Sequence, residues 1–253
     1  MKHGLIKTEK EIHIIAEGGK LLRDILYNTA QLVKPDVSTW ELNKFTEEMI
    51  AKAGGRPSFK GFGPNGNEYP AGLCTSVNDE IVHGIPSKTV ILKPGDIIGL
   101  DIGMEYKNLY TDTAITVTVG QVSDTASRLI SITKKCLDSA VKAAKPGQRT
   151  GDIGFAIQTI AEQAGFSVVR DLVGHGVGYS VHEDPQVPCY GRPGQGMKLQ
   201  EGMVLAIEPM LCEKGWKIFI DDDGWTIRTA DGGLAAHFEH TVAIEKDGAK
   251  VLT

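Results

Sequence analysis

Apolar residues recur at helical spacing in four segments of the chain. The first segment follows Thr8 and the second follows Ser38, and each starting residue has a Glu three positions later. That spacing is typical of a capping box, in which the two side chains satisfy free amides at a helix start. Two further helices are predicted at 124–144 and 150–164, where apolar residues again form one stripe.

Runs rich in β-branched and other apolar residues follow each pair of predicted helices. Such runs, when bounded by turn residues, are typical of β-strands. The order of two helices and then several strands therefore occurs twice along the chain. The predicted strands are 73–78, 97–104, 109–119, 203–211, 216–221, 225–229 and 236–245.

The second helix of each pair lies in a similar stretch of sequence. VKPDVSTWELNKFTEEMIAKAGG begins at Val33 and AKPGQRTGDIGFAIQTIAEQAGF begins at Ala144, an offset of 111 residues without a gap. A duplicated helix–helix–strand unit explains the match; coincidence is the alternative, because Ala-Gly is common at helix ends. We expect one domain over 1–253, with internal halves of about 8–120 and 121–253 and a site between them.

Composition excludes several classes of protein. The chain has 253 residues, 41% of them hydrophobic, and can bury a full core. Its net charge of −5 and lack of a basic, aromatic-rich block argue against sequence-specific nucleic-acid binding. The four cysteines form no C-x-x-C pair, which fits a reducing compartment. Without an apolar run for a signal peptide or a membrane span, a soluble cytoplasmic protein is expected.

Two aspartates lie in neighbouring predicted strands. If residues 105–108 form the turn between these strands, Asp101 faces Asp112 directly. Opposed strand residues have Cβ atoms roughly 4.5–5.5 Å apart, so the two carboxylates would repel. Burying them unpaired would cost several kcal/mol per ion. A metal cation between them would remove that cost; the alternative is an edge hairpin with both side chains in solvent.

Two glutamates lie inside apolar runs of the second half. Glu208 is in MVLAIEPML and Glu239 is in AAHFEHTVAI. A strand glutamate often faces solvent, but the neighbours of Glu208 are apolar on both sides. Together with the two aspartates these residues carry four negative charges, which two divalent cations would balance. Oxygen ligands with an occasional imidazole suit Mn, Fe, Co or Zn.

A glycine-rich segment, GHGVGYSVHEDP (174–185), contains two histidines and two acids. One interpretation is a polar loop. The other is a metal or catalytic site in which the glycines let the backbone approach a ligand closely. The segment alone does not decide between these interpretations.

Seven short strings place these acidic residues and histidines in a recognisable order: CTSVNDEIVHGIP (74–86), LDIG (100–103), TDTA (111–114), GHGVG (174–178), HEDPQV (182–187), IEPM (207–210) and FEHT (238–241). With these strings the chain resembles the type I methionine aminopeptidases. The resemblance covers nearly the whole chain, from IKTEKEI at the N-terminus to about residue 245. It implies an α/β (α+β) pita-bread fold: two pseudo-symmetric helix–helix–strand halves around a curved antiparallel sheet.

The same resemblance implies a catalytic site with two divalent metal ions, which would be Co, Mn, Fe or Zn. Asp112 and Glu239 would bridge the ions, and Glu208 would also transfer protons. His182 would hydrogen-bond the scissile carbonyl, and His83 would lie near the scissile nitrogen. The five implied metal ligands are Asp101, Asp112, His175, Glu208 and Glu239.

A methionine pocket is also implied by the resemblance. Ordinary core packing is the alternative interpretation of its residues. The sequence departs from the family in GPNGNE (63–68), which is longer than the usual two-residue link, in Val181, where an aromatic is common, and in His237, which is often Gln. These departures leave the metal ligands intact but are expected to affect the shape of the pocket and the level of activity. The implied pocket residues are Phe59, Phe62, Tyr69, Cys74 and Trp225.

The activity implied is release of the initiator methionine from nascent polypeptides by a monomeric enzyme. The ribosome near its exit is a candidate partner, and neither a membrane nor a specific nucleic acid is expected. One alternative is an Xaa-Pro aminopeptidase or dipeptidase, which usually carries an extra N-terminal domain. Another is a metal-free binding protein on this scaffold, although such relatives lose ligands. The 31 residues from Glu208 to Glu239 leave no room for the type II helical insertion.

Overall fold

Capping boxes start the first two helices, as the sequence predicts. The computed structural model describes residues 4–253. At the start of α1 (Glu9–Ala30), the Thr8 hydroxyl accepts a hydrogen bond from the Glu11 amide, and the Glu11 carboxylate accepts one from the Thr8 amide. The same reciprocal pair starts α2 (Thr39–Lys52). Each box satisfies two amides that a helix start would otherwise leave free.

The second pair of helices repeats the first. It consists of α3 (Asp124–Ala143) and α4 (Thr150–Gln163), and α4 starts 111 residues after α2. The backbone contacts before these helices also correspond: Ser38 bridges Ile91, and Arg149 bridges Lys198. The two halves are therefore pseudo-symmetric, as predicted.

The largest sheet has nine strands, and all of its pairings are antiparallel. Its order is β1-β4-β5-β14-β9-β7-β8, with β2 paired to β4 and β15 paired to β14. Strand β14 thus joins the strands of the first half to those of the second. The strands are β1 (Arg56–Pro57), β2 (Leu73–Val77), β4 (Ile97–Tyr106), β5 (Leu109–Thr118), β7 (Val173–Gly176), β8 (Glu183–Pro188), β9 (Val204–Ile207), β14 (Glu239–Glu245) and β15 (Gly248–Val251).

Two predicted strands are each divided between two sheets. The expectation of continuous strands at 203–211 and 236–245 is wrong, because the chain leaves the large sheet at Pro209 and enters it at Phe238. Proline has no amide to donate to a ladder, and the Phe238 amide donates to the Pro209 carbonyl where the two breaks meet. The smaller sheets contain β6 (Ser167–Val168), β10 (Met210–Cys212) and β13 (Ala235–His237), and β3 (Glu80–Val82), β11 (Ile218–Ile220) and β12 (Ile227–Thr229).

The hairpin of β4 and β5 closes with a two-residue turn rather than the predicted four-residue turn. Lys107 and Asn108 have φ values of 50° and 64°, as a type I′ turn requires. Asp101 consequently pairs with Ala114, so the predicted direct opposition of Asp101 and Asp112 is wrong. The two aspartates are diagonal neighbours on the same face of the sheet, because they differ from direct pairing by two residues.

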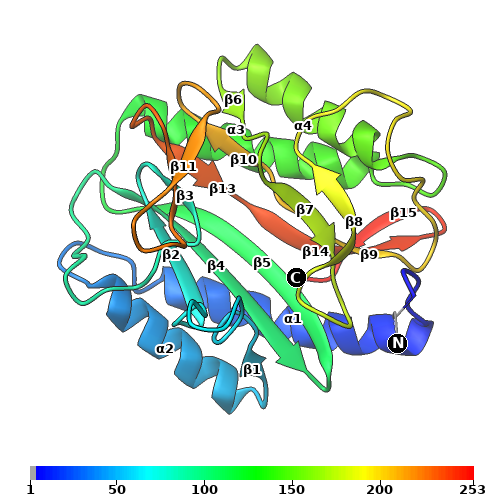
Figure 1. The fold of residues 1–253 in the computed structure, drawn as a ribbon, viewed down its shortest axis with the longest axis horizontal. Helices are drawn as coiled ribbons and strands as arrows, with labels where there is room; N and C mark the ends of the chain where they lie inside the picture. The colour runs from blue at the N-terminus through cyan, green and yellow to red at the C-terminus, as the bar shows by residue number, and fades with distance from the viewer. Residues whose placement is uncertain (1–3) are drawn as a thin grey trace.

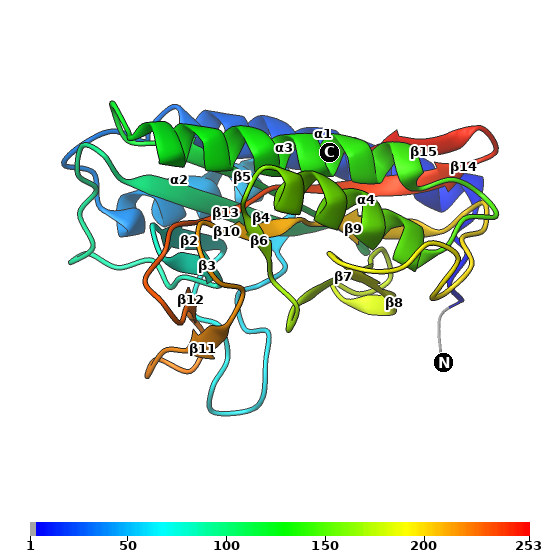
Figure 2. The same ribbon diagram turned by 90° about the horizontal axis from the view of Figure 1, so that it is seen from above.

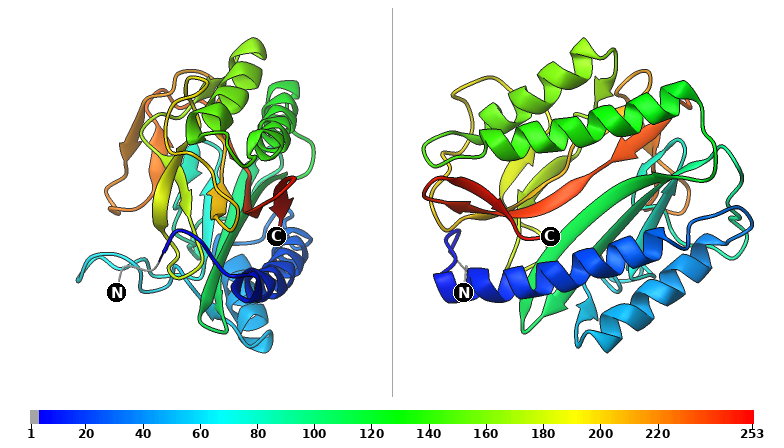
Figure 3. Two further views of the ribbon diagram at one scale, coloured as in Figure 1. Left: turned by 90° about the vertical axis from the view of Figure 1, so that its right-hand side faces the viewer. Right: turned by 180° about the vertical axis from the view of Figure 1, so that it is seen from behind.

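The helices cover one face of the curved sheet. Figure 1 shows the large sheet running between the α1–α2 and α3–α4 pairs. Figures 2 and 3 show α1 and α3 lying along the back of the sheet, with β3, β11 and β12 on the opposite side. Completely buried Leu22, Leu100 and Leu129 belong to the core between the layers. Within residues 4–253, no helix has the length and apolar content needed to cross a membrane.

Candidate metal centre and substrate cavity

Three strands of the large sheet bring three acidic side chains together. Asp101 of β4 and Glu239 of β14 both pair with Ala114 of β5, from opposite sides. Asp112 lies two residues before Ala114 on β5, and its backbone is fastened to Thr241 of β14: the Asp112 amide donates to the Thr241 hydroxyl, which donates to the Asp112 carbonyl. The carboxyl groups therefore project from regular, paired backbone.

These three carboxyl groups are buried without enough hydrogen-bond partners. Asp101 Oδ1, Asp112 Oδ1 and Glu239 Oε1 have no partner at all. Burial raises the pKa of Asp101 to about 7. Burial, followed by the charge of Asp101, raises the pKa of Asp112 well above its usual range; burial and then Asp112 do the same to the pKa of Glu239. The group can ionise fully near neutral pH only with a positive counter-charge, and a cation fits this requirement.

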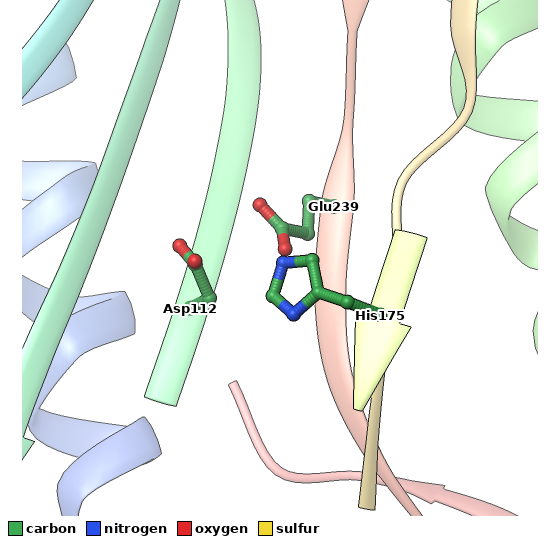
Figure 4. A group of neighbouring side chains, drawn as sticks. All are labelled: Asp112, His175 and Glu239. Atoms are coloured by element: carbon green, nitrogen blue, oxygen red, sulfur yellow. The ribbon is translucent and has the colours of Figure 1, made fainter. Parts of the chain in front are cut away.

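His175 adds an imidazole to the acidic group. One ligand atom each from Asp112, His175 and Glu239 lies within 4.8 Å of the others (Figure 4). The His175 Nδ1 is 2.9 Å from the Gly176 carbonyl, which can only accept a hydrogen bond, so Nδ1 carries the proton. In the neutral ring, Nε2 then keeps a lone pair, as a metal ligand must.

Glu208 lies in the break between β9 and β10, not inside a strand as predicted. Its Oε1 is 3.5 Å from the His175 Nε2, and its Oε2 is 3.6 Å from the His237 Nε2. Burial alone would raise the pKa of Glu208, but His237, His175 and His182 outweigh burial and lower it. When His175 is neutral, its lone pair faces the Glu208 carboxylate, and a shared cation would relieve this repulsion.

His83 and His182 lie on irregular backbone at the wall of the same cavity. The ring of His182 is 4.4 Å from that of His175, and the ring of His83 is 6.1 Å from that of Trp225. Burial lowers the pKa of each of these histidines to about 4. Both are therefore neutral at pH 7 and can each donate one ring N–H.

A single cavity of about 500 Å³ brings all of the predicted site residues together. Each of the implied metal ligands, catalytic histidines and pocket residues contributes to its wall. The predicted residues on the wall are Phe59, Phe62, Tyr69, Cys74, His83, Asp101, Asp112, His175, His182, Glu208, Trp225 and Glu239.

Seven further residues line the cavity and were not predicted as site residues. Glu183 and Asp184 follow His182 in the glycine-rich segment, and this proximity to a predicted site histidine could have indicated that they line the cavity. The apolar residues among the seven resemble ordinary strand residues, and no spacing distinguishes them. The seven are Val82, Leu172, Val173, Glu183, Asp184, Gln186 and Met210.

Aromatic side chains form the wall beyond the histidines. Tyr69 meets Trp225 edge to face at 5.3 Å, and Phe62 meets His182 at 4.9 Å. The Tyr69 hydroxyl donates to the Gly84 carbonyl at 2.9 Å. Val181 is buried in this cluster, which is separate from the main core. Phe59, Tyr69, Cys74 and Trp225 therefore pack together and face the cavity, whereas Phe62 is 42% exposed and contacts the His182 ring at the cavity wall.

The departures at 63–68 and His237 affect different parts of the site. The 63–68 loop lies against Trp225, whose indole Nε1 donates to the Asn67 carbonyl at 3.1 Å. A Cβ on Gly63 would lie 2.6 Å from the Trp225 ring, so the loop approaches the cavity edge closely. His237 lies on the other side, beside Glu208, and its Nε2 is buried without a hydrogen-bond partner.

Solved structures share the fold over nearly the whole chain. A crystal structure of methionine aminopeptidase from Thermotoga maritima has a TM-score of 0.95 and 43% identity, and the match covers 98% of both chains. A prolidase from Pyrococcus horikoshii has a TM-score of 0.78 at 25% identity, and this chain covers 63% of it. The predicted pita-bread fold is confirmed, and the Xaa-Pro alternative is not favoured.

Sequence comparisons agree with the structural ones. The model of metallopeptidase family M24 matches residues 13–246. The methionine aminopeptidase of Clostridium perfringens is 46% identical, and methionine aminopeptidase 1 of Bacillus subtilis is 45% identical; each match covers 98% of both chains. The chain therefore belongs to metallopeptidase family M24 and, within that family, to the methionine aminopeptidases.

Proposed function

We propose that this enzyme hydrolyses the first peptide bond of nascent proteins to release the initiator methionine, and that it does so with two divalent metal ions. The observation that carries the proposal is the group of buried carboxylate oxygens without hydrogen-bond partners on Asp101, Asp112 and Glu239. A cation is the simplest partner for these oxygens, and the donor set suits Co, Mn, Fe or Zn. Bound there, a divalent ion would supply Lewis acidity toward water and the peptide carbonyl.

Five residues would hold the two ions. Asp112 and Glu239 would serve both, and Asp101 would complete the first. His175 and Glu208 would complete the second. The support for this division is that one ligand atom each from Asp112, His175 and Glu239 lies within 4.8 Å of the others, with Asp101 and Glu208 beside them on the same cavity wall.

Glu208 would also transfer the proton during hydrolysis. Its pKa is lowered, above all by His237, so its carboxylate is ionised and can accept a proton from the attacking water. The same carboxylic acid would then donate that proton to the leaving amine. The residue lies in the break between β9 and β10 and lines the cavity.

His182 and His83 would bind the peptide bond. The neutral His182 ring would donate its N–H to the scissile carbonyl oxygen, and this hydrogen bond would strengthen as negative charge develops there. His83, next to Trp225, would lie near the scissile nitrogen. Burial that keeps both rings neutral supports these roles, because a neutral ring donates a hydrogen bond without adding charge beside the cations.

The aromatic wall would bind the methionine side chain. Thioether sulfur packs favourably at aromatic ring edges, and the edge-to-face ring packing of this wall offers such edges. The acidic end of the cavity would bind the region of the free α-amine and thus restrict cleavage to the chain end. The proposed pocket residues are Phe59, Phe62, Tyr69, Cys74 and Trp225.

We further propose that the enzyme acts as a monomer in the cytoplasm on chains that are leaving the ribosome. Its four cysteines, Cys74, Cys136, Cys189 and Cys212, are all buried and unpaired. Free thiols in this number fit a reducing compartment, which supports the cytoplasmic location.

The test compares two peptides on metal-free protein supplied with Mn, Fe, Co or Zn. We expect release of methionine from Met-Ala-Ser with at least one of these metals, little cleavage of an Ala-Pro peptide, and no turnover after chelation. Preference for Ala-Pro would assign the protein to the Xaa-Pro enzymes instead. Full activity after exhaustive chelation would contradict the metal proposal.

A further inference from the structure

A buried ion pair links the N-terminal segment to the loop that carries His182. The Lys7 side chain is 1% exposed, and its Nζ lies 2.5 Å from the Glu183 Oε2; the Glu183 side chain is 13% exposed. Lysine is seldom buried so completely without a specific partner. The Lys7 backbone is also fixed, because its amide donates to the Gly202 carbonyl at 2.8 Å.

Glu183 uses its second carboxylate oxygen to close the loop between β7 and β8. Its Oε1 accepts hydrogen bonds from the amides of Tyr179 and Ser180, the latter at 2.8 Å. Its backbone pairs with Gly176 at the end of the β7–β8 ladder. One carboxylate therefore ties the middle of the 177–182 loop to the point where the loop ends.

The stem of Lys7 fits closely against the same loop. Gly178 has a φ of 142°, and a Cβ there would lie 2.6 Å from the Lys7 Cε. The Lys7 Nζ also lies over the Tyr179 ring, 4.8 Å from its centre. The loop is thus shaped around the lysine, and the glycine permits the contact.

We propose that Lys7 is a positioning residue for His182, an inference that rests on the function proposed above for that histidine. His182 immediately precedes Glu183, and its ring contacts those of His175 and Phe62 edge to face. By holding Glu183 and the loop, Lys7 fixes the backbone from which the His182 ring projects. Lys7 does not line the cavity, so it acts through the loop and not by touching the substrate.

The test is a double-mutant cycle between Lys7 and His182. We expect Lys7→Met to lower kcat for Met-Ala-Ser by roughly 10- to 100-fold, the scale of a misplacement of about 1 Å in an active site. KM and metal content should change little, and the amides of Tyr179 and Ser180 should exchange hydrogen faster. In the His182→Ala background, Lys7→Met should cost little further activity, because the positioned group is already gone.

Two companion variants separate positioning from general stability. Lys7→Met with Glu183→Gln removes both charges but keeps an amide oxygen that can accept from the loop amides, so kcat should partly recover relative to Lys7→Met. This variant also carries the test if Lys7→Met alone fails to fold. Lys107→Met, which breaks the 2.6 Å pair with Glu17 on α1 away from the cavity, should leave kcat unchanged.

Two outcomes would overturn the inference, and they are distinguishable from failure of the proposed function. An unchanged kcat in folded Lys7→Met would contradict the positioning role of Lys7. So would a double variant with His182→Ala whose loss of kcat is the product of the two single losses. Neither result would affect the function proposed for His182. An unchanged kcat in His182→Ala by itself would contradict the proposed role of His182, and with it the purpose assigned to Lys7. Amide exchange in the loop reports on the Lys7 contact independently of activity.

Discussion

The two sides of the cavity are built differently. On one side Asp101, Asp112 and Glu239 project from long strands whose backbone is paired on both edges. On the other side His83 and His182 project from irregular segments, and His83 has a positive φ of 60°. The first group is positioned mainly by backbone ladders, supplemented by the Thr241 hydroxyl at Asp112, whereas the loop of His182 is closed by the Glu183 side chain. Loss of a residue should therefore have different consequences on the two sides.

The largest effect is expected on the strand side. Asp112→Ala should abolish both hydrolysis and tight metal binding, because this carboxylate is proposed to serve both ions. Turnover of Met-Ala-Ser and metal content by elemental analysis measure the two losses in one sample. Near wild-type turnover in the variant would contradict the dinuclear assignment.

On the loop side the loss should be confined to catalysis. His182→Ala should lower kcat by roughly 10²–10³, the usual cost of removing one donor to a developing oxyanion. Metal content should remain at the wild-type level, because His182 is proposed to bind the substrate and not the metals. Loss of metal from this variant would instead make His182 a ligand and remove the distinction between the two sides.

Removing the metals should expose the charge repulsion on the strand side. The pKa of Asp101 rises from 3.8 to about 7 in the folded, metal-free protein. The folded state then binds a proton that the unfolded state releases, so this group makes stability fall as pH rises from about 4 to about 7. We expect the unfolding free energy of chelated protein, relative to metal-loaded protein, to decrease by a few kcal/mol over that range.

Urea unfolding of both forms at pH 5 and pH 8 measures this dependence. Asp101→Asn removes one titrating group and should make the curve of the chelated protein less steep, while Asp112 and Glu239, whose pKa values are also raised, keep part of the dependence. A chelated protein whose relative stability is the same at both pH values would show that burial of these carboxyl groups carries no charge penalty.

The smallest effect concerns the side chain of the substrate. Replacement of methionine by norleucine in Met-Ala-Ser should weaken cleavage only modestly, because an apolar pocket discriminates between such side chains by about 1–3 kcal/mol. Replacement of methionine by leucine should weaken cleavage further, because the branch of leucine is misplaced. Recognition of the free amine is tested separately: the N-acetylated peptide should not be cleaved. The ratio of kcat/KM values measures the preference. Efficient cleavage of the acetylated peptide would contradict recognition of the free amine.

Local signals in the sequence predicted the helices well, but not the strand register. The capping residues Thr8 and Ser38 act within one turn, so their effect is readable from neighbouring letters. The hairpin register depended on whether two or four residues form the turn, and Lys107-Asn108 lacks the glycine that usually marks a type I′ turn. The breaks at Pro209 and Phe238 depend on two distant segments meeting, which no local pattern reports.

The sequence predicted those site residues that lie in recognisable strings, and it missed those that do not. The acidic residues and histidines were identified because their spacing and flanking strings resemble a known family. Lys7 was missed because its partner Glu183 lies 176 residues away, and a single lysine beside a helix start has no distinctive pattern. Met210, an apolar residue of the cavity wall, was missed because nothing in the sequence distinguishes it from a buried strand residue of the core.

The central place of β14 has a consequence for synthesis of the enzyme itself. This strand lies between β5 and β9 in the large sheet, yet it follows both of them in the sequence and is therefore made after them. A chain interrupted before residue 239 would lack Glu239 and would leave β5 and β9 with unpaired edges. Exposed strand edges are templates for aggregation. Incomplete copies should therefore be inactive, because they lack Glu239, and prone to associate through the exposed edges of β5 and β9. We expect chaperones and proteases to act on them before they can compete with the complete enzyme for substrate.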